Sequence, residues 1–173
     1  MKLSLKLSYL SGGVLLGAMV STLLWAQTPV TGVPSAEALT KSPDKKLEAN
    51  KTLILNLFKE VFEARHFDAV DKYLAADMIQ HNPNFANGNE PLKRLAGKNP
   101  PLPINETIQR KFVTIMAEGD MVLAAFPREL PDPDDPSKTY TTVQFDLYRI
   151  QNGKVVEHWD NALKNSRNSK KGN

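Results

Sequence analysis

The sequence predicts an α+β domain in which helices come first and a mostly antiparallel sheet follows. Apolar residues recur at helical spacing between residues 43 and 64, whereas the segments after residue 107 are rich in Ile, Val and Phe. The dipeptide Asn152-Gly153, between two apolar segments, is a strong signal for a tight hairpin. This order is typical of folds in which helices cover one face of a curved sheet.

Length and composition limit the classes of protein to consider. The chain has 173 residues, of which 41% are hydrophobic and none is cysteine. One domain with a real core is therefore expected, and disulfides, thiolate metal sites and Cys nucleophiles are excluded. The net charge of +3 arises at the ends of the chain, because the body 27–163 carries about −3. An acidic body argues against nucleic-acid binding.

The ends of the chain are predicted to lie outside the fold. Residues 1–26 combine two lysines with a short apolar run ending at Ala26, the pattern of a secretory signal peptide. The alternative is an uncleaved membrane anchor, which needs about 20 apolar residues. Export would place the protein in a bacterial periplasm or outside the cell. Residues 27–43 are expected to form a flexible linker, 44–163 the domain, and 164–173 a basic disordered tail.

The helical half begins with Ser42-Pro43-Asp44, where Ser42 is the expected cap and Pro43 the first helical residue. An amphipathic helix over 43–64 follows. Shorter elements come next: a helix at 69–74, a strand at 77–81 that ends at Asn82-Pro83, a helix at 90–96 and a proline-containing loop at 97–103.

The second half reads as a strand meander. The expected strands are 107–117, 121–126, 139–150 and 154–162. Four prolines within Pro127–Pro136 predict a protruding loop there, because proline cannot donate a hydrogen bond to a strand neighbour.

The last hairpin can be given a register. If Asn152-Gly153 is a two-residue loop, Asp146 lies opposite Trp159 and Tyr148 lies opposite Glu157. One face then carries Gln144, Asp146, Tyr148, Glu157 and Trp159, and the other carries Val156 and His158. A bulge near the turn would instead shift the pairing by one residue and exchange the two faces of the last strand.

Two segments resemble a known family. The first is Tyr73–Pro83, with Gln-His-Asn-Pro at the end of a short strand; the second is Phe145–Asp160, with D-x-x-R, a two-residue turn and E-H-W-D. Together they resemble the SnoaL-like polyketide cyclases of the nuclear transport factor 2-like superfamily, over about residues 47–161. The resemblance implies a cone-shaped α+β barrel, often dimeric, with a pocket between the sheet and the helices.

The resemblance also implies an activity. SnoaL-like cyclases close a ring by intramolecular aldol condensation without metal or organic cofactor, and an aspartate that matches Asp146 acts as general acid/base. Aldol or isomerisation chemistry requires a carboxylate that takes a proton from a carbon next to a carbonyl and a donor that stabilises the enolate oxygen. An apolar pocket raises the pKa of such a carboxylate toward the working pH, as in ketosteroid isomerase.

These requirements select the candidate site residues. Asp146 is the expected base, and His81 is the expected proton donor or oxyanion partner. The expected substrate-binding residues are Asn82, Gln144, Tyr148, Trp159 and, less directly, His158. No metal is expected, because Glu157, His158 and Asp160 would alternate between the faces of one strand.

The expected partner is a small hydrophobic carbonyl compound, bound by a homodimer with no cofactor and no nucleic acid. A membrane would be contacted only through an uncleaved signal segment. Two alternatives stay open: a binding module of the same fold without turnover, and a structural protein that dimerises through the outer face of its sheet.

Overall fold

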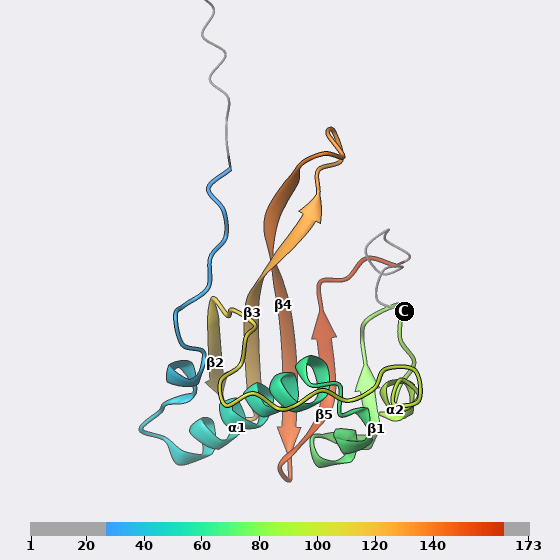
Figure 1. The fold of residues 1–173 in the computed structure, drawn as a ribbon. Helices are drawn as coiled ribbons and strands as arrows, with labels where there is room; N and C mark the ends of the chain where they lie inside the picture. The colour runs from blue at the N-terminus through green and yellow to red at the C-terminus, as the bar shows by residue number, and fades with distance from the viewer. Residues whose placement is uncertain (1–26, 165–173) are drawn as a thin grey trace, which may run out of the picture.

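The computed structural model describes residues 27–164, in which helices lie on one face of a curved five-stranded sheet (Figure 1). The strands are β1 Leu74–Gln80, β2 Thr114–Glu118, β3 Met121–Pro131, β4 Thr139–Gln151 and β5 Lys154–Asp160. Their order in the sheet is β1-β5-β4-β3-β2; β1 is parallel to β5 and every other pair is antiparallel. The predicted α+β class with a mostly antiparallel sheet is confirmed. The proposed signal peptide and nearly all of the basic tail lie outside the described residues.

The long predicted helix is confirmed as two continuous pieces. Helix α1 spans Lys45–Asn56 and passes directly into a wider π-type segment, η2, at Leu57–Glu63. The predicted cap is wrong: Asp44, not Ser42, accepts hydrogen bonds from the backbone N–H groups of Lys46 and Leu47 at 2.8 and 3.2 Å. A carboxylate at this position also favours the helix through the partial positive charge of its N-terminus. No helix within residues 27–164 has the length and apolar character needed to cross a membrane.

Several shorter elements differ from their predicted bounds. The helix expected at 69–74 is a 3₁₀ segment, η3, at Phe67–Lys72, and α2 covers only Glu90–Lys93. Strand β2 starts at Thr114 rather than near residue 107. Before it, backbone N–H groups bind side chains instead of a neighbouring strand: Gln109 and Arg110 donate to the carboxylate of Glu63 at 3.0 and 2.6 Å.

Half of the proline-rich segment, residues 127–131, is strand rather than loop. Strand β3 continues to Pro131, which pairs with Thr139 of β4, so the loop shrinks to residues 132–138. Strand β2 begins at Thr114, opposite Ala125, and β3 therefore has no β2 neighbour at Pro127, whose missing N–H breaks no ladder with β2. The resulting two-stranded arm projects well beyond the helices (Figure 1).

Residues 27–43, expected to form a flexible linker, run along the domain and bind to it. The side chain of Gln27 donates to the carbonyl of Thr141 at 2.7 Å and accepts from its N–H at 3.2 Å. Further on, Val33 N–H donates to the carbonyl of Phe112 at 2.7 Å, and a 3₁₀ turn, η1, covers Glu37–Thr40.

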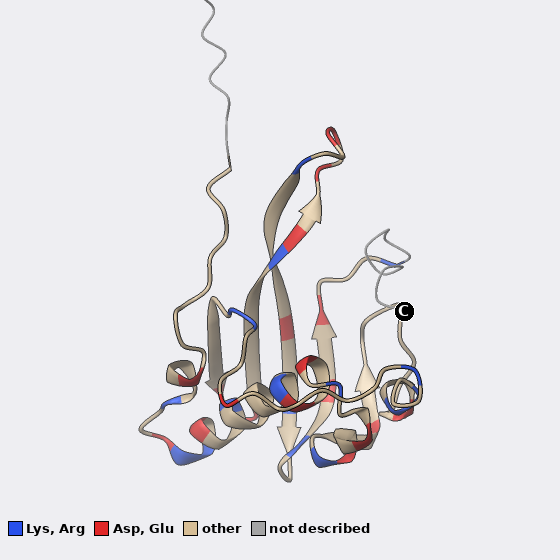
Figure 2. Cartoon of the chain, viewed as in Figure 1, with Lys and Arg blue, Asp and Glu red and all other residues tan. Residues whose placement is uncertain are grey.

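The core fills the space between the α1–η2 helix and the inner face of the sheet. Phe58, Phe112 and Phe126 form a cluster with ring centroids 5.2 to 5.8 Å apart and tilted or edge-to-face planes. Such pairs contribute about 0.5–1.5 kcal/mol each beyond the burial of their surface. Charged side chains lie mainly on the helices and loops, and most of the strand surface in the body is uncharged (Figure 2).

The last hairpin contains a bulge that decides which residues face the helices. Asn152 and Gly153 adopt positive φ values of 50° and 72°, which suit the predicted tight turn. Ile150 pairs with Val155 as predicted, but Arg149 pairs with Glu157, so Val156 is an extra residue on β5. The simple two-residue register is therefore wrong beyond this point, and the bulged alternative is present.

The shift changes the neighbours of Asp146. Asp160, not Trp159, lies opposite Asp146, and His158 lies opposite Tyr148. Trp159 lies opposite Leu147 and is turned to the outer face of the sheet. The inner face at this point therefore carries His158 and Asp160 instead of Trp159 and Glu157.

Candidate active site

A buried carboxylate lies on the inner face of β4. Asp146 is 9% exposed and accepts two hydrogen bonds, from the Gln144 amide at 3.0 Å and from the Tyr148 hydroxyl at 3.1 Å. Burial raises the pKa of Asp146, although these two donors and His158 act in the opposite direction. A carboxylate whose pKa is raised in this way is better suited to proton transfer near neutral pH than an exposed one.

The donors to Asp146 are themselves held in place. Arg128 donates to the side-chain oxygen of Gln144 at 3.0 Å, which leaves the amide nitrogen to face Asp146. Tyr148 is 4% exposed, and burial together with the charge of Asp146 raises its pKa well above the usual value. Tyr148 is therefore a neutral hydroxyl that donates to Asp146.

His158 faces Asp146 from the neighbouring strand. Its ring stacks on Tyr148 with centroids 4.7 Å apart, and its Nε2 lies 3.9 Å from Asp146 Oδ1. Nε2 is buried and has no hydrogen-bond partner, whereas Nδ1 lies 2.9 Å from the side-chain oxygen of Gln80. Burial lowers the pKa of His158, and the nearby carboxylates of Asp146 and Asp160 offset part of that effect.

Asp160 and Asn82 complete the inner cluster. The Asn82 amide donates to the Asp160 carboxylate, which also accepts from the N–H of Ala162 at 2.9 Å. The ligand atoms of Asp146, His158 and Asp160 all lie within 4.8 Å of one another, so these three side chains could hold a divalent cation. The bulge creates this set, which the simple register kept apart.

The structure does not bring His81 to Asp146. His81 Nε2 lies 2.8 Å from Glu157 on the outer face of the sheet, and its ring stacks on Trp159 with centroids 4.9 Å apart. Arg149 binds the same Glu157 at 3.0 Å and lies over the Trp159 ring. The predicted partnership of His81 with Asp146 and the predicted place of Trp159 beside Asp146 are both wrong, because the side chains fall on opposite faces.

The other predicted residues fall within the inner cluster. Gln144, Tyr148, Asn82 and His158 all lie there, and His158 replaces His81 as the imidazole next to Asp146. Gln80 and Asp160 were not predicted as site residues. Both occur in the two segments that carry the family resemblance, and Gln80 directly precedes His81.

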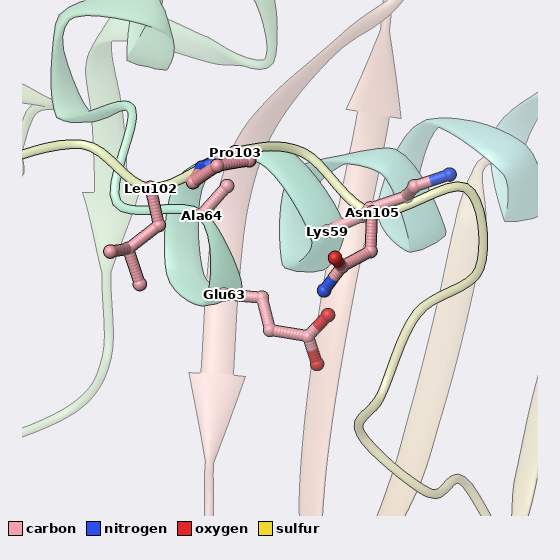
Figure 3. A pocket seen from close by; sticks show the side chains of 6 residues that line it. All are labelled: Lys59, Glu63, Ala64, Leu102, Pro103 and Asn105. Carbon is pink, nitrogen blue, oxygen red and sulfur yellow. The ribbon is translucent and has the colours of Figure 1, made fainter.

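Two cavities lie elsewhere on the domain. One, of about 250 Å³, is lined by Lys59, Glu63, Ala64, Leu102, Pro103 and Asn105, between η2 and the loop at 102–105 (Figure 3). The other, of about 430 Å³, is lined by Val30, Thr31, Gly32, Val33, Pro34, Lys111 and Pro127. Asp146 lines neither, but the side chains of Asp146 and His158 keep 13% and 12% of their surface exposed.

Comparisons with known proteins find one matching family model and several similar solved structures. The model of the SnoaL-like domain family matches residues 55–158. A candidate polyketide cyclase from Acidithiobacillus ferrooxidans is 17% identical with a TM-score of 0.44, covering 69% of this chain and 89% of its own. IdmH, a candidate polyketide cyclase from Streptomyces antibioticus, is 15% identical with a TM-score of 0.45, covering 64% and 89%.

A third similar structure has a different activity. A LEH-like epoxide hydrolase from M. tuberculosis is 19% identical with a TM-score of 0.41, covering 73% of this chain and 82% of its own. Among curated proteins no significant match is found.

Proposed function

The chain belongs to the SnoaL-like domain family, and we propose that it performs cofactor-free acid/base chemistry on a small carbonyl compound, with Asp146 as the base and His158 as its proton-exchange partner. Membership of the family does not by itself fix an activity. One observation carries the proposal: a buried carboxylate faces a buried imidazole nitrogen that has no hydrogen-bond partner, 3.9 Å away.

The proposed reaction starts with proton transfer to Asp146. The carboxylate takes a proton from the carbon next to the carbonyl, the C–H electron pair moves toward the carbonyl carbon, and an enolate forms. Once the 3.9 Å between Asp146 Oδ1 and Nε2 of His158 closes to hydrogen-bond distance, or a water bridges it, Asp146 passes this proton to Nε2, whose lone pair is free to accept it. The imidazolium that results stabilises the enolate oxygen as a donor and then returns the proton to the ligand through Asp146, so that both residues recover their starting state.

The surroundings of the pair support this chemistry. Burial keeps His158 neutral and Asp146 basic, and removal of water strengthens their interaction with any charge that forms. Tyr148 stacks on His158, and Phe58 packs edge-on against Tyr148 with ring centroids 6.5 Å apart, so aromatic side chains enclose this side of the pair. The ligand that this chemistry requires is a small, largely apolar compound with one carbonyl group.

We further propose that the protein is exported and works as a homodimer. Export rests on the signal-peptide pattern of residues 1–26.

The proposal of a homodimer rests on a row of apolar side chains aligned across the outer face of the sheet: Met116, Leu123, Leu147 and Trp159. Met116 is 54% exposed and Phe145, on the same face, 46%. An apolar surface of this kind is typical of an interface. Phe145→Glu should turn a dimer into a monomer in light scattering, whereas Phe85→Glu should not.

The catalytic proposal can be tested without knowing the natural substrate. 2-Tetralone in D₂O loses its α-proton NMR signals as a base exchanges them for deuterium. We expect the full chain to accelerate this exchange and Asp146→Asn to abolish the acceleration. Asp77→Asn is the matched control, because Asp77 is an exposed aspartate on β1. Equal exchange by the wild type and Asp146→Asn would refute the proposal.

The same experiment separates two other functions. If 2-tetralone binds but is not exchanged, the protein acts as a binding module. If exchange requires Zn²⁺ and stops with EDTA, the cluster of Asp146, His158 and Asp160 works as a metal site. The acid/base proposal expects EDTA to leave the rate unchanged.

A further inference from the structure

We infer that Gln80 is a positioning residue that fixes the tautomer of His158, with the proton on Nδ1 and the free lone pair of Nε2 facing Asp146. The chemical consequence of this arrangement rests on the proposed function, but the tautomer itself does not. Three structural observations carry the inference.

The orientation of the Gln80 amide is fixed by the backbone. The N–H of Asn82 lies 2.9 Å from the side-chain Oε1 of Gln80. A backbone N–H can only donate, so its partner must be an acceptor, and the side-chain atom at this position is the oxygen rather than the nitrogen.

The same oxygen also contacts the histidine. Nδ1 of His158 lies 2.9 Å from Oε1 of Gln80. An amide oxygen only accepts hydrogen bonds, so Nδ1 must carry the proton that it donates. In a neutral imidazole the other nitrogen then has no proton, and Nε2 is a pure acceptor. Nε2 is buried and has no hydrogen-bond partner, which suits a nitrogen that carries no proton.

The sheet holds the two side chains together. Gln80 pairs with His158 in the parallel ladder between β1 and β5. The next residue reinforces the pairing, because the N–H of His81 donates to the carbonyl of His158 at 2.9 Å. Three consecutive residues therefore act together on His158. The Asn82 N–H orients the Gln80 amide, the His81 N–H holds the backbone of His158, and the Gln80 oxygen accepts from its ring.

The tautomer determines what His158 can do for Asp146. With Nε2 unprotonated, the ring can accept a proton from Asp146. The opposite tautomer would point an N–H at Asp146 Oδ1, 3.9 Å away, which would favour the ionised carboxylate and leave no acceptor for its proton. Gln80 therefore sets the direction in which the proton can move.

NMR of the ¹⁵N-labelled full chain tests the inference directly. Long-range ¹H–¹⁵N correlation distinguishes the two neutral tautomers of each of the three histidines, and His158→Gln identifies which signals belong to His158. We expect the wild type to show protonated Nδ1 and unprotonated Nε2. A wild-type spectrum with protonated Nε2 would overturn the inference whatever the variants do.

Two variants of Gln80 provide the matched comparison. Gln80→Leu removes the acceptor and should abolish the preference for protonated Nδ1. Gln80→Glu keeps an acceptor oxygen and should restore it. The signals of His66, which lies in another part of the fold, report whether each variant is folded. Retention of protonated Nδ1 in folded Gln80→Leu would contradict the role of Gln80.

The activity assay gives a second, separable result. Gln80→Leu should slow the exchange of 2-tetralone by about 10–100-fold, as loss of an orienting partner does for metal-bound histidines, and Gln80→Glu should recover most of it. If the tautomer is as inferred but no exchange occurs, the proposed function fails and the inference stands. If exchange that depends on Asp146 occurs with protonated Nε2, the inference and the role of His158 as proton acceptor both fail, whereas Asp146 remains the base.

Discussion

Removal of one hydroxyl group tests whether the inner cluster is an ionised, buried network. Tyr148→Phe deletes the donor that lies 3.1 Å from Asp146 Oδ2 and leaves the ring and its packing in place. Hydrogen bonds to charged groups contribute about 1.5–3 kcal/mol. The observed distance is longer than the roughly 2.5–2.7 Å of the strongest hydroxyl–carboxylate bonds, so the lower end of this range applies.

We therefore expect Tyr148→Phe to lower the free energy of unfolding by about 1.5 kcal/mol at pH 7. With a urea dependence of about 1–3 kcal/mol per molar, the unfolding midpoint should fall by about 0.5–1.5 M. Tryptophan fluorescence during urea unfolding measures this shift. Tyr140→Phe is the control, because Tyr140 is 37% exposed and its change should stay within about 0.5 kcal/mol.

The effect should also depend on pH. The Tyr148 hydroxyl lowers the pKa of Asp146, which burial has raised above 3.8, so its loss raises that pKa further. A carboxyl group whose pKa is raised in the folded state stabilises the folded state at low pH, and this contribution is lost as the pH rises through the raised pKa. Tyr148→Phe should therefore destabilise the protein more at pH 7 than at pH 3. An equal loss at both pH values, or a loss no larger than that of Tyr140→Phe, would refute an ionised Asp146 at this site.

Three further changes test other parts of the structure. The pKa of His158 is lowered from 6.5, so the contribution of the neutral ring to stability is present above pH 6.5 and is lost as the pH falls. Between pH 7.5 and pH 5 the melting temperature of His158→Gln should therefore fall less than that of the wild type. Phe112→Ala, at a side chain that is 0% exposed, should lower the unfolding free energy by about 3–5 kcal/mol in urea, and a loss below about 1 kcal/mol would contradict the packed core. Gly88→Ala should lower the melting temperature, because φ is 84° and a Cβ would lie 2.8 Å from the carbonyl oxygen of Ala76, whereas Gly97→Ala, with open space around it, should not.

Much of the architecture is readable from local sequence signals. Helical periodicity predicts the α1–η2 helix, and Asn152-Gly153 predicts the turn that its positive φ values confirm. The strand ends are harder to predict, because the backbone N–H groups of Gln109 and Arg110 bind Glu63 and β2 starts only at Thr114. That contact joins residues 46 or 47 positions apart, and no local pattern records it.

The candidate site depended on one residue of register. Asp146, Gln144 and Tyr148 were correctly placed together because they alternate along one strand. The histidine was misassigned because Val156 bulges, and apolar Val-Val before Glu-His-Trp gives no local sign of which valine is the extra residue. Packing of His158 against Tyr148 and Gln80 is the long-range contact that accompanies the bulged register.

The contact between Gln27 and Thr141 has a consequence for solubility. The arm of β3 and β4 extends beyond the body of the sheet. An unpaired strand edge can pair with the same edge of another molecule and so start an aggregate. The amide of Gln27 occupies both the N–H and the carbonyl of Thr141, as a neighbouring strand would. Gln27 therefore covers the edge of the arm at Thr141, and a truncated protein that lacks Gln27 would expose this edge and self-associate more readily.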